Sequence, residues 1–149
     1  MSLPNKAIAV LLVLLAGYYG LQQRDQGPSA VPASPRQHAV EDLISKAFRQ
    51  RANDLPVTGE GEVIRLLSDD LEGSRHQRFI IRLSSGHTLM VAHNIDLAPR
   101  LNALDSGDSI EFSGVYEWNE RGGVVHWTHH DPQGRRPGGW IKHRGKKYR

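Results

Sequence analysis

Cysteine is absent from the 149-residue chain. Its absence excludes a disulfide framework, a cysteine-ligated zinc site, a thiol nucleophile and a lipid-modified cysteine at the amino terminus. Any metal ion would have to be held by histidine, aspartate or glutamate. The absence does not identify a compartment, because a disulfide-free domain can fold in the cytoplasm or in the periplasm.

A long apolar run is lacking as well. An uncharged apolar segment extends from Ala7 to Leu21, and as a helix it would span roughly 22 Å at about 1.5 Å per residue, against a hydrocarbon core of about 30 Å. This length suits the core of a signal peptide, but no clean small-x-small cleavage site follows. Residues 1–21 are therefore expected to be a signal peptide or a short membrane anchor.

This segment also predicts where the protein resides. Lys6 and the amino terminus favour an inside start. We therefore expect the rest of the chain to be periplasmic or otherwise extracytoplasmic. It would be attached to the inner membrane through residues 7–21 or secreted after cleavage.

Acidic residues are scarce at the carboxyl end. Residues 1–120 hold 11 Lys and Arg against 15 Asp and Glu, whereas residues 121–149 hold 8 against 1, a net charge of +7. Trp140 and Tyr148 are interleaved with these cations. Such a basic tail suits a polyanion, since cations neutralise phosphates while aromatic faces stack on bases. A solvated, partly frayed terminus is the alternative.

The remaining chain divides into a linker, a helix and a domain. Residues 22–37 are rich in Pro, Ser, Gln and Ala, which is typical of a flexible or extended spacer. Apolar residues recur at helical spacing over residues 38–54 and predict an amphipathic helix. The chain is long enough for one core, and residues 57–149 are predicted to form it, ending in the basic tail.

Short alternating segments dominate this domain. Three strands are predicted over residues 60–70, 75–85 and 87–95, followed by a short helix within residues 96–108 and two strands over residues 109–118 and 124–130. Gly114 lies in the middle of the fourth strand, where a barrel must bend. The pattern predicts a mainly β fold, a small OB-like five-stranded barrel with the short helix between strands three and four. A small antiparallel sandwich is the alternative.

Three histidines crowd the stretch "VVHWTHHDP", residues 124–132. In a regular strand His126 and His129 point to opposite faces, and His126 and His130 lie about 13 Å apart, so neither pair can chelate one ion. A metal site requires the strand to end near Thr128 and the Asp-Pro pair to turn the backbone. The candidate cofactor is a divalent transition metal. The ligands predicted for it are His93, His129, His130 and Asp131.

The motif "AHNID", residues 92–96, stands where the third strand ends. His93 has the parity of core-facing residues, and a histidine on that side needs a hydrogen-bond partner or it destabilises the fold. Asn94 or Asp96 is expected either to cap the following helix or to join a site with His93.

Basic side chains also gather in "SRHQRF", residues 74–79, and "GGWIKH", residues 138–143. Arginines can grip phosphate or carboxylate in a forked geometry, or simply form the charged outer face of a strand. The ligand-binding residues predicted from these clusters and from the tryptophans are His76, Asn94, Trp118, Trp127, Trp140, Lys142 and His143.

Four motifs, "RHQRF", "AHNID", "GVYEWNERGGVVHWTHHDPQGR" and "GGWIKHRGKKY", together resemble the uncharacterised bacterial domain-of-unknown-function family 3465. The resemblance covers about residues 57–149. It implies no particular activity, because the family has none established. It implies that the domain commonly follows a signal or anchor segment.

Three roles are compatible with these patterns. As a binding module, the barrel would hold an anionic ligand such as nucleic acid on its tryptophans and basic tail. As a metal-dependent phosphodiesterase or nuclease, it would use His126 as general base and Arg75 to offset charge on phosphate. The third role is a structural domain of the cell envelope. Because carboxylates are sparse in the motifs, whereas hard-cation sites usually want several, binding is favoured.

Overall fold

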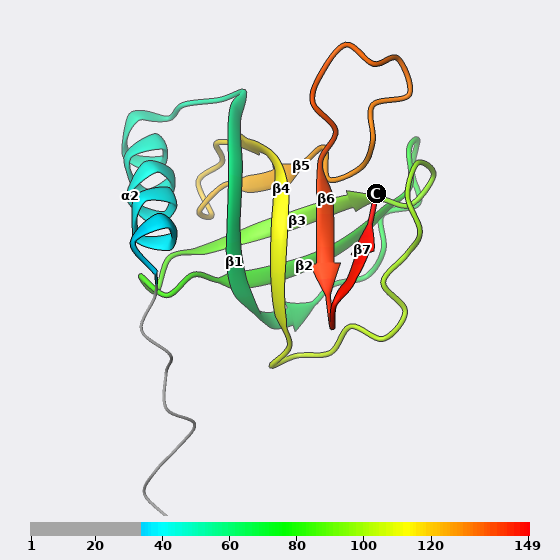
Figure 1. The fold of residues 1–149 in the computed structure, drawn as a ribbon, viewed down its shortest axis with the longest axis horizontal. Coiled ribbons are helices and arrows are strands. Elements are labelled where there is room, and N and C mark those ends of the chain that lie inside the picture. The colour runs from blue at the N-terminus through cyan, green and yellow to red at the C-terminus, as the bar shows by residue number, and fades with distance from the viewer. Residues whose placement is uncertain (1–33) are drawn as a thin grey trace, which may run out of the picture. The chain divides into compact units, whose positions relative to one another are not determined.

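The computed structural model describes residues 34–149, which form one helix and seven strands (Figure 1). The predicted signal peptide or anchor, and most of the predicted linker, lie outside the described residues. Within the described part of the chain, the helix is not long and apolar enough to cross a membrane.

Helix α2 (Pro35–Gln50) begins earlier than the helical spacing predicted. The Ser34 side chain accepts a hydrogen bond from the Gln37 backbone N–H at 3.3 Å, and the proline that follows Ser34 suits the first helical turn. The helix ends where Arg51 adopts a left-handed conformation with φ 53°. It therefore includes the last residues of the predicted linker.

Strand pairing closes the sheet into a barrel. The strands are β1 (Leu55–Leu66), β2 (His76–Arg82), β3 (Thr88–Asn94), β4 (Ser109–Glu117), β5 (Val124–His126), β6 (Trp140–His143) and β7 (Lys146–Tyr148). The order β1-β2-β3-β5-β4 closes because β1 also pairs with β4. Strands β3 and β5 are parallel, and the other pairs are antiparallel. This arrangement confirms the predicted OB-like barrel.

Alternating side chains fill the barrel. Phe79, Ile81 and Phe112 are fully buried, whereas their strand neighbours face outward. At Gly114 a Cβ atom would overlap the His126 carbonyl oxygen and lie 2.9 Å from Val125 Cγ1. The glycine predicted at the bend is thus required by the close approach of β5 to β4.

Helix α2 is attached to the barrel by a buried carboxylate. Glu41 is 4% exposed. Its two oxygens accept hydrogen bonds from the Ser84 N–H, the Ser84 hydroxyl and the Ser85 N–H at 2.8–2.9 Å. Ile44 and Ala47 on the same helix are buried in the core. The helix therefore packs against the barrel and its β2–β3 turn.

Two segments differ from the prediction. Residues 96–108 form turns instead of a short helix. The Gln77 amide bonds both the N–H and the carbonyl of Leu101, at 2.9 and 3.0 Å, and Pro99 interrupts the helical pattern. The basic tail, for which no strand was predicted, forms two: β6 pairs with β4 and with β7, which buries Ile141 and Tyr148. The frayed terminus, which the sequence left as an alternative, is therefore not what the structure shows.

Candidate functional site

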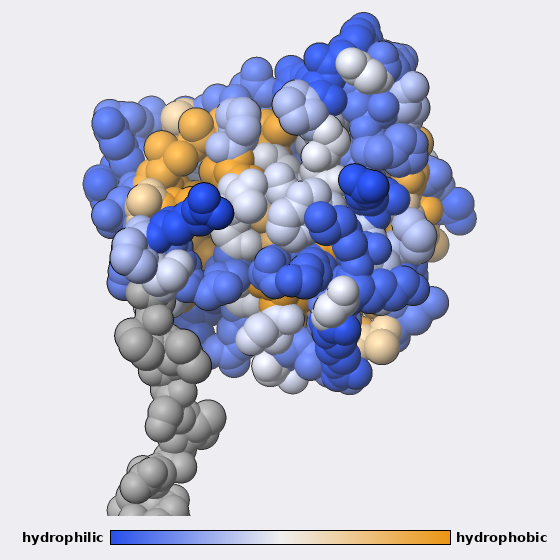
Figure 2. Space-filling view, viewed as in Figure 1, coloured by the Kyte–Doolittle hydropathy of each residue, from blue (hydrophilic) through white to orange (hydrophobic). Residues whose placement is uncertain are grey.

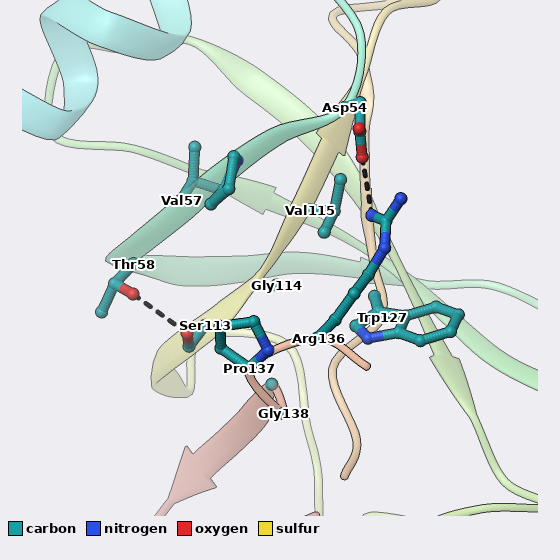
Figure 3. A pocket seen from close by; sticks show the side chains of 12 residues that line it. Asp54, Val57, Thr58, Ser113, Gly114, Val115, Trp127, Arg136, Pro137 and Gly138 are labelled. Atoms are coloured by element: carbon teal, nitrogen blue, oxygen red, sulfur yellow. Dashed lines mark hydrogen bonds and ion pairs between the residues drawn. The ribbon is translucent and has the colours of Figure 1, made fainter. Parts of the chain in front are cut away.

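A hollow of about 320 Å³ lies on the outer face of β1 and β4, beside the loop that joins β5 to β6 (Figure 3). We refer to it as the first hollow. Thr58 and Ser113 form its floor, with their hydroxyl oxygens 3.0 Å apart. Asp54, Trp127 and Arg136 surround it.

Trp127 is the most unusual residue of this hollow. Its φ is 58°, a left-handed conformation that bulky side chains rarely adopt. Its indole nitrogen is buried and has no hydrogen-bond partner within residues 34–149. Figure 3 shows the edge of the ring that carries this nitrogen facing Arg136. Backbone strain clusters at functional sites, and a buried donor without a partner requires an explanation.

Arg136 closes one side of the first hollow. Its Nη1 donates to Asp54 Oδ1 at 2.7 Å, and its guanidinium carbon lies 5.8 Å from the centre of the Trp127 ring. The hydrogen bond to Asp54 raises the pKa of Arg136. Asp54 is also left-handed, with φ 55°. Two of the four non-glycine residues with positive φ in residues 34–149 thus line this hollow.

The loop that carries Arg136 is fixed by Asp131. Its carboxylate accepts from the backbone N–H groups of Gln133, Arg135 and Arg136 at 2.6–2.9 Å, and these bonds lower its pKa. At the end of the loop the Gly139 N–H donates to the His129 carbonyl at 2.8 Å. The loop is therefore an ordered wall of the hollow.

A second hollow of about 270 Å³ adjoins the first, because Thr58 lines both. Its other lining residues include Arg36, Glu60, Glu111 and Trp140. Lys142 Nζ lies 2.6 Å from a carboxylate oxygen of Glu111, and Lys147 Nζ lies 4.4 Å from the centre of the Trp140 ring. Figure 2 shows this face as a pale area over β1 and β4, with hydrophilic side chains toward β6 and the β5–β6 loop.

Three of the four residues predicted as metal ligands, His93, His129 and Asp131, are hydrogen-bonded to protein groups. His93 is completely buried; its Nδ1 lies 2.8 Å from Thr128 Oγ1 and its Nε2 lies 3.2 Å from the Pro99 carbonyl oxygen. Burial lowers the pKa of His93 from 6.5 to about 4. His129 is also buried, with its Nδ1 2.6 Å from the carbonyl oxygen of His130, whose own side chain is exposed. Within residues 34–149, no three His, Asp or Glu side chains are grouped to hold a metal ion.

The two residues predicted to be catalytic lie in different settings. His126 lines a third hollow, about 390 Å³, on the outer face of β2, β3 and β5, with Nε2 3.7 Å from a Glu117 oxygen. Arg75 instead pairs with Asp96, through its backbone N–H at 2.8 Å and its Nε at 2.6 Å. These bonds lower the pKa of Asp96.

The predicted ligand-binding residues are dispersed. Trp127 lines the first hollow, Trp140 the second and His76 the third, where His76 Nδ1 lies 2.7 Å from the Ser74 carbonyl oxygen. Asn94 accepts from the Asp96 N–H at 2.9 Å, which is a turn contact.

Two further residues predicted to bind ligand, Trp118 and His143, are in contact with other side chains of the protein. The Arg51 guanidinium stacks over the Trp118 ring at 5.0 Å. His143 is buried, with Nε2 2.8 Å from Asp108. Bonds to Asp108, first from the Asp105 N–H and then from Arg144 and His143, lower the pKa of Asp108 to about 2.

Sequence reasoning missed Asp54 and Arg136. The two are 82 positions apart, and neither belongs to a repeating pattern. The one local signal is the pair of glycines after Arg136. At Gly139 a Cβ atom would overlap the Trp127 carbonyl oxygen and lie 2.5 Å from that of Ser113, so the chain must pass this point without a side chain.

No curated protein matches this chain. A family model described as "Protein of unknown function (DUF3465)" matches residues 29–149, which include the helix and the whole barrel. The chain belongs to the family DUF3465.

Proposed function

We propose that the domain is a binding module that holds an anionic ligand, a phosphate of nucleic acid, in the first hollow against Arg136 and Trp127. The observation that carries the proposal is the indole N–H of Trp127, which is buried without an acceptor in residues 34–149 on a backbone with φ 58°. An unpaired buried donor destabilises a fold. Because the nitrogen is covered by its surroundings, a ligand would supply the acceptor after a shift of the Arg136 side chain that faces it (Figure 3).

Arg136 provides the charge for such a ligand. A guanidinium has several N–H donors in a fixed fork, and Asp54 receives the bond from Nη1. The donors that remain suit a phosphate in forked geometry. Thr58 and Ser113 add hydroxyl groups on the floor of the same hollow.

The basic carboxyl segment supports this choice, but its charge is partly neutralised. Of its 8 cations, Arg136, Lys142 and Arg144 form ion pairs with Asp54, Glu111 and Asp108. The module should therefore contact few phosphates. For two contacts to a single strand, the logarithm of the binding constant should fall with the logarithm of salt concentration with a slope of about −1.4.

Binding to the full chain in detergent tests the proposal. The probe is a fluorescent, mixed-sequence, single-stranded DNA of about 12 nucleotides. Arg136→Gln and Trp127→Phe should each weaken binding about tenfold or more, since each removes a donor to a charged group, and Arg136→Gln should also reduce the salt slope by about 0.7. Unchanged affinity in both variants would overturn the proposal.

Arg100→Gln is the matched control. Arg100 makes a comparable ion pair, with its Nε 2.9 Å from Asp69, and does not line the first hollow. It removes the same charge from the protein. Equal weakening by Arg100→Gln and Arg136→Gln would assign the effect to net charge.

The same mixture addresses the enzymatic alternative. With Zn²⁺ or Mn²⁺ added, and with chelator in parallel, the DNA should keep its length. Metal-dependent cleavage that is lost in His126→Ala and Arg75→Gln would instead favour a phosphodiesterase or nuclease.

We also propose that the module acts outside the cytoplasm. The support is the apolar segment Ala7 to Leu21 with Lys6 before it. Alkaline phosphatase fused to the carboxyl terminus should be active in cells, because it needs an oxidising compartment to form its disulfides. An inactive fusion would contradict this location.

A further inference from the structure

We propose that the second hollow binds the base of an adjoining nucleotide, and that it prefers a base with an amino group, with cytosine as the fitting case. This inference rests on the proposed function. It takes the ligand to be a single-stranded oligonucleotide, with a phosphate in the first hollow and the base of an adjoining nucleotide in the second.

The two hollows are consecutive along one strand. The first is lined by Pro56, Val57 and Thr58 of β1, and the second by Thr58, Gly59 and Glu60. The stretches of β1 that line them are thus displaced by two residues, about 7 Å of extended strand. A single step along an extended nucleotide chain bridges such a distance.

The second hollow has an aromatic wall. Trp140 lines it, while the ammonium group of Lys147 lies 4.4 Å from the centre of the ring. The proposed base would stack on the part of the ring that lines the hollow. Aromatic rings in single-strand binding proteins are stacking platforms for any base.

Its carboxylates explain why a base, and not a phosphate, occupies it. Glu60 and Glu111 both line the second hollow. Lys142 neutralises Glu111 at 2.6 Å, and the opposite charges of Glu60 and Arg36, which both line the hollow, offset each other, so the lining carries no net positive charge to attract phosphate. A carboxylate accepts hydrogen bonds only, and the exocyclic amino group of cytosine is the donor that Glu and Asp characteristically recognise. Thymine has no such amino group.

The first hollow offers hydrogen-bond donors, whereas the second offers carboxylate acceptors. The Trp127 N–H and the Arg136 guanidinium are donors, and they suit phosphate oxygens. The Trp127 ring is also less accessible for stacking, because Arg136 lies 5.8 Å and His129 5.0 Å from its centre. The two hollows therefore divide the recognition of phosphate and base between them.

The test compares oligo(dC) with oligo(dT), each of about 12 nucleotides, on the full chain in detergent. Oligo(dC) should bind about fivefold or more tightly than oligo(dT). Trp140→Ala should weaken both by about five- to a hundredfold. Glu60→Ala, which removes the acceptor, should abolish the preference without weakening oligo(dT), and the exposed Glu72→Ala should change neither.

The outcomes separate this inference from the proposed function. If both oligonucleotides bind equally and Trp140→Ala has no effect, while Arg136→Gln still weakens binding, the second subsite is refuted and the module remains. If deoxycytidine monophosphate competes as well as oligo(dC) does, the oligomeric ligand is refuted. If neither oligonucleotide binds, both proposals fail.

Discussion

The Nδ1 atom of His93 lies 2.8 Å from the hydroxyl oxygen of Thr128 inside the barrel, where both residues are fully buried. The contact joins the end of β3 to the chain just beyond β5. The Pro99 carbonyl, 3.2 Å from Nε2, can only accept a hydrogen bond, so Nε2 carries the proton and Nδ1 accepts from Thr128. The ring is therefore a neutral core histidine with both nitrogens satisfied.

This environment makes stability depend on pH through His93. Burial lowers its pKa from 6.5 to about 4, so its contribution is present above pH 6.5 and is lost as pH falls toward 4. Between pH 7 and pH 4.5 the loss should be about 2–3 kcal/mol. Urea unfolding of the wild type and of His93→Gln measures it. The carboxylates titrate in both proteins, so the free energy of unfolding lost between pH 7 and pH 4.5 should be larger by this amount in the wild type than in His93→Gln. Equal losses in the two proteins would show that His93 is not buried as described.

Thr128 should matter for its hydroxyl more than for its methyl group. Thr128→Val keeps the shape but leaves Nδ1 of His93 unpaired in the core, which should reduce the free energy of unfolding by about 1–3 kcal/mol. Thr128→Ser keeps the hydroxyl and loses one methyl group, worth about 0.8 kcal/mol. Ring ¹⁵N shifts of His93 should show the Nε2–H tautomer in Thr128→Ser. A valine variant at least as stable as the serine variant would contradict the role of this bond.

The barrel could be predicted because its signals are local. Phe79 and Ile81 alternate with polar residues, and Ile110, Phe112 and Tyr116 share the buried face of β4. The two errors arise from distant contacts. The helical pattern of residues 96–108 is overridden by Gln77, and the short strands β6 and β7 exist because β4 pairs with β6.

The site was predictable only in part for the same reason. Their residue type predicts Trp127 and Trp140 as ligand-binding residues, and each lines a hollow. Asp54 and Arg136 come from opposite ends of the domain, and no local sequence pattern predicts their contact. Strand parity placed His93 on the core side correctly, but it could not supply Thr128 as its partner.

Asp131 should stabilise the β5–β6 loop, whose backbone N–H groups it binds. In Asp131→Ala the amides of Gln133, Arg135 and Arg136 lose their acceptor, so their hydrogen exchange should accelerate about tenfold or more and DNA binding should weaken. Asp131→Asn keeps an acceptor oxygen and should give an intermediate rate. Equal exchange rates in the wild type, Asp131→Asn and Asp131→Ala would contradict the role of Asp131 in holding the loop.

Glu41 should determine whether helix α2 stays on the barrel. Its carboxylate, 4% exposed, accepts from Ser84 and Ser85, and hydrogen bonds to charged groups contribute about 1.5–3 kcal/mol each. Glu41→Ala should therefore reduce the free energy of unfolding by at least about 2 kcal/mol, whereas its exposed neighbour Asp42→Ala should change it by less than about 0.5 kcal/mol. Urea unfolding gives both values, and amide exchange at Ser84 and Ser85 locates the change.

The same helix supplies Arg36 to the second hollow. Loosening α2 should therefore lower affinity for oligo(dC), while the first hollow, which has no lining residue from α2, keeps its contacts. Under conditions where Glu41→Ala remains folded, its affinity for oligo(dC) should be lower than that of the wild type. If amide hydrogen exchange at the β2–β3 turn is as slow in Glu41→Ala as in the wild type, apolar packing through Ile44 and Ala47 is enough to hold the helix in place.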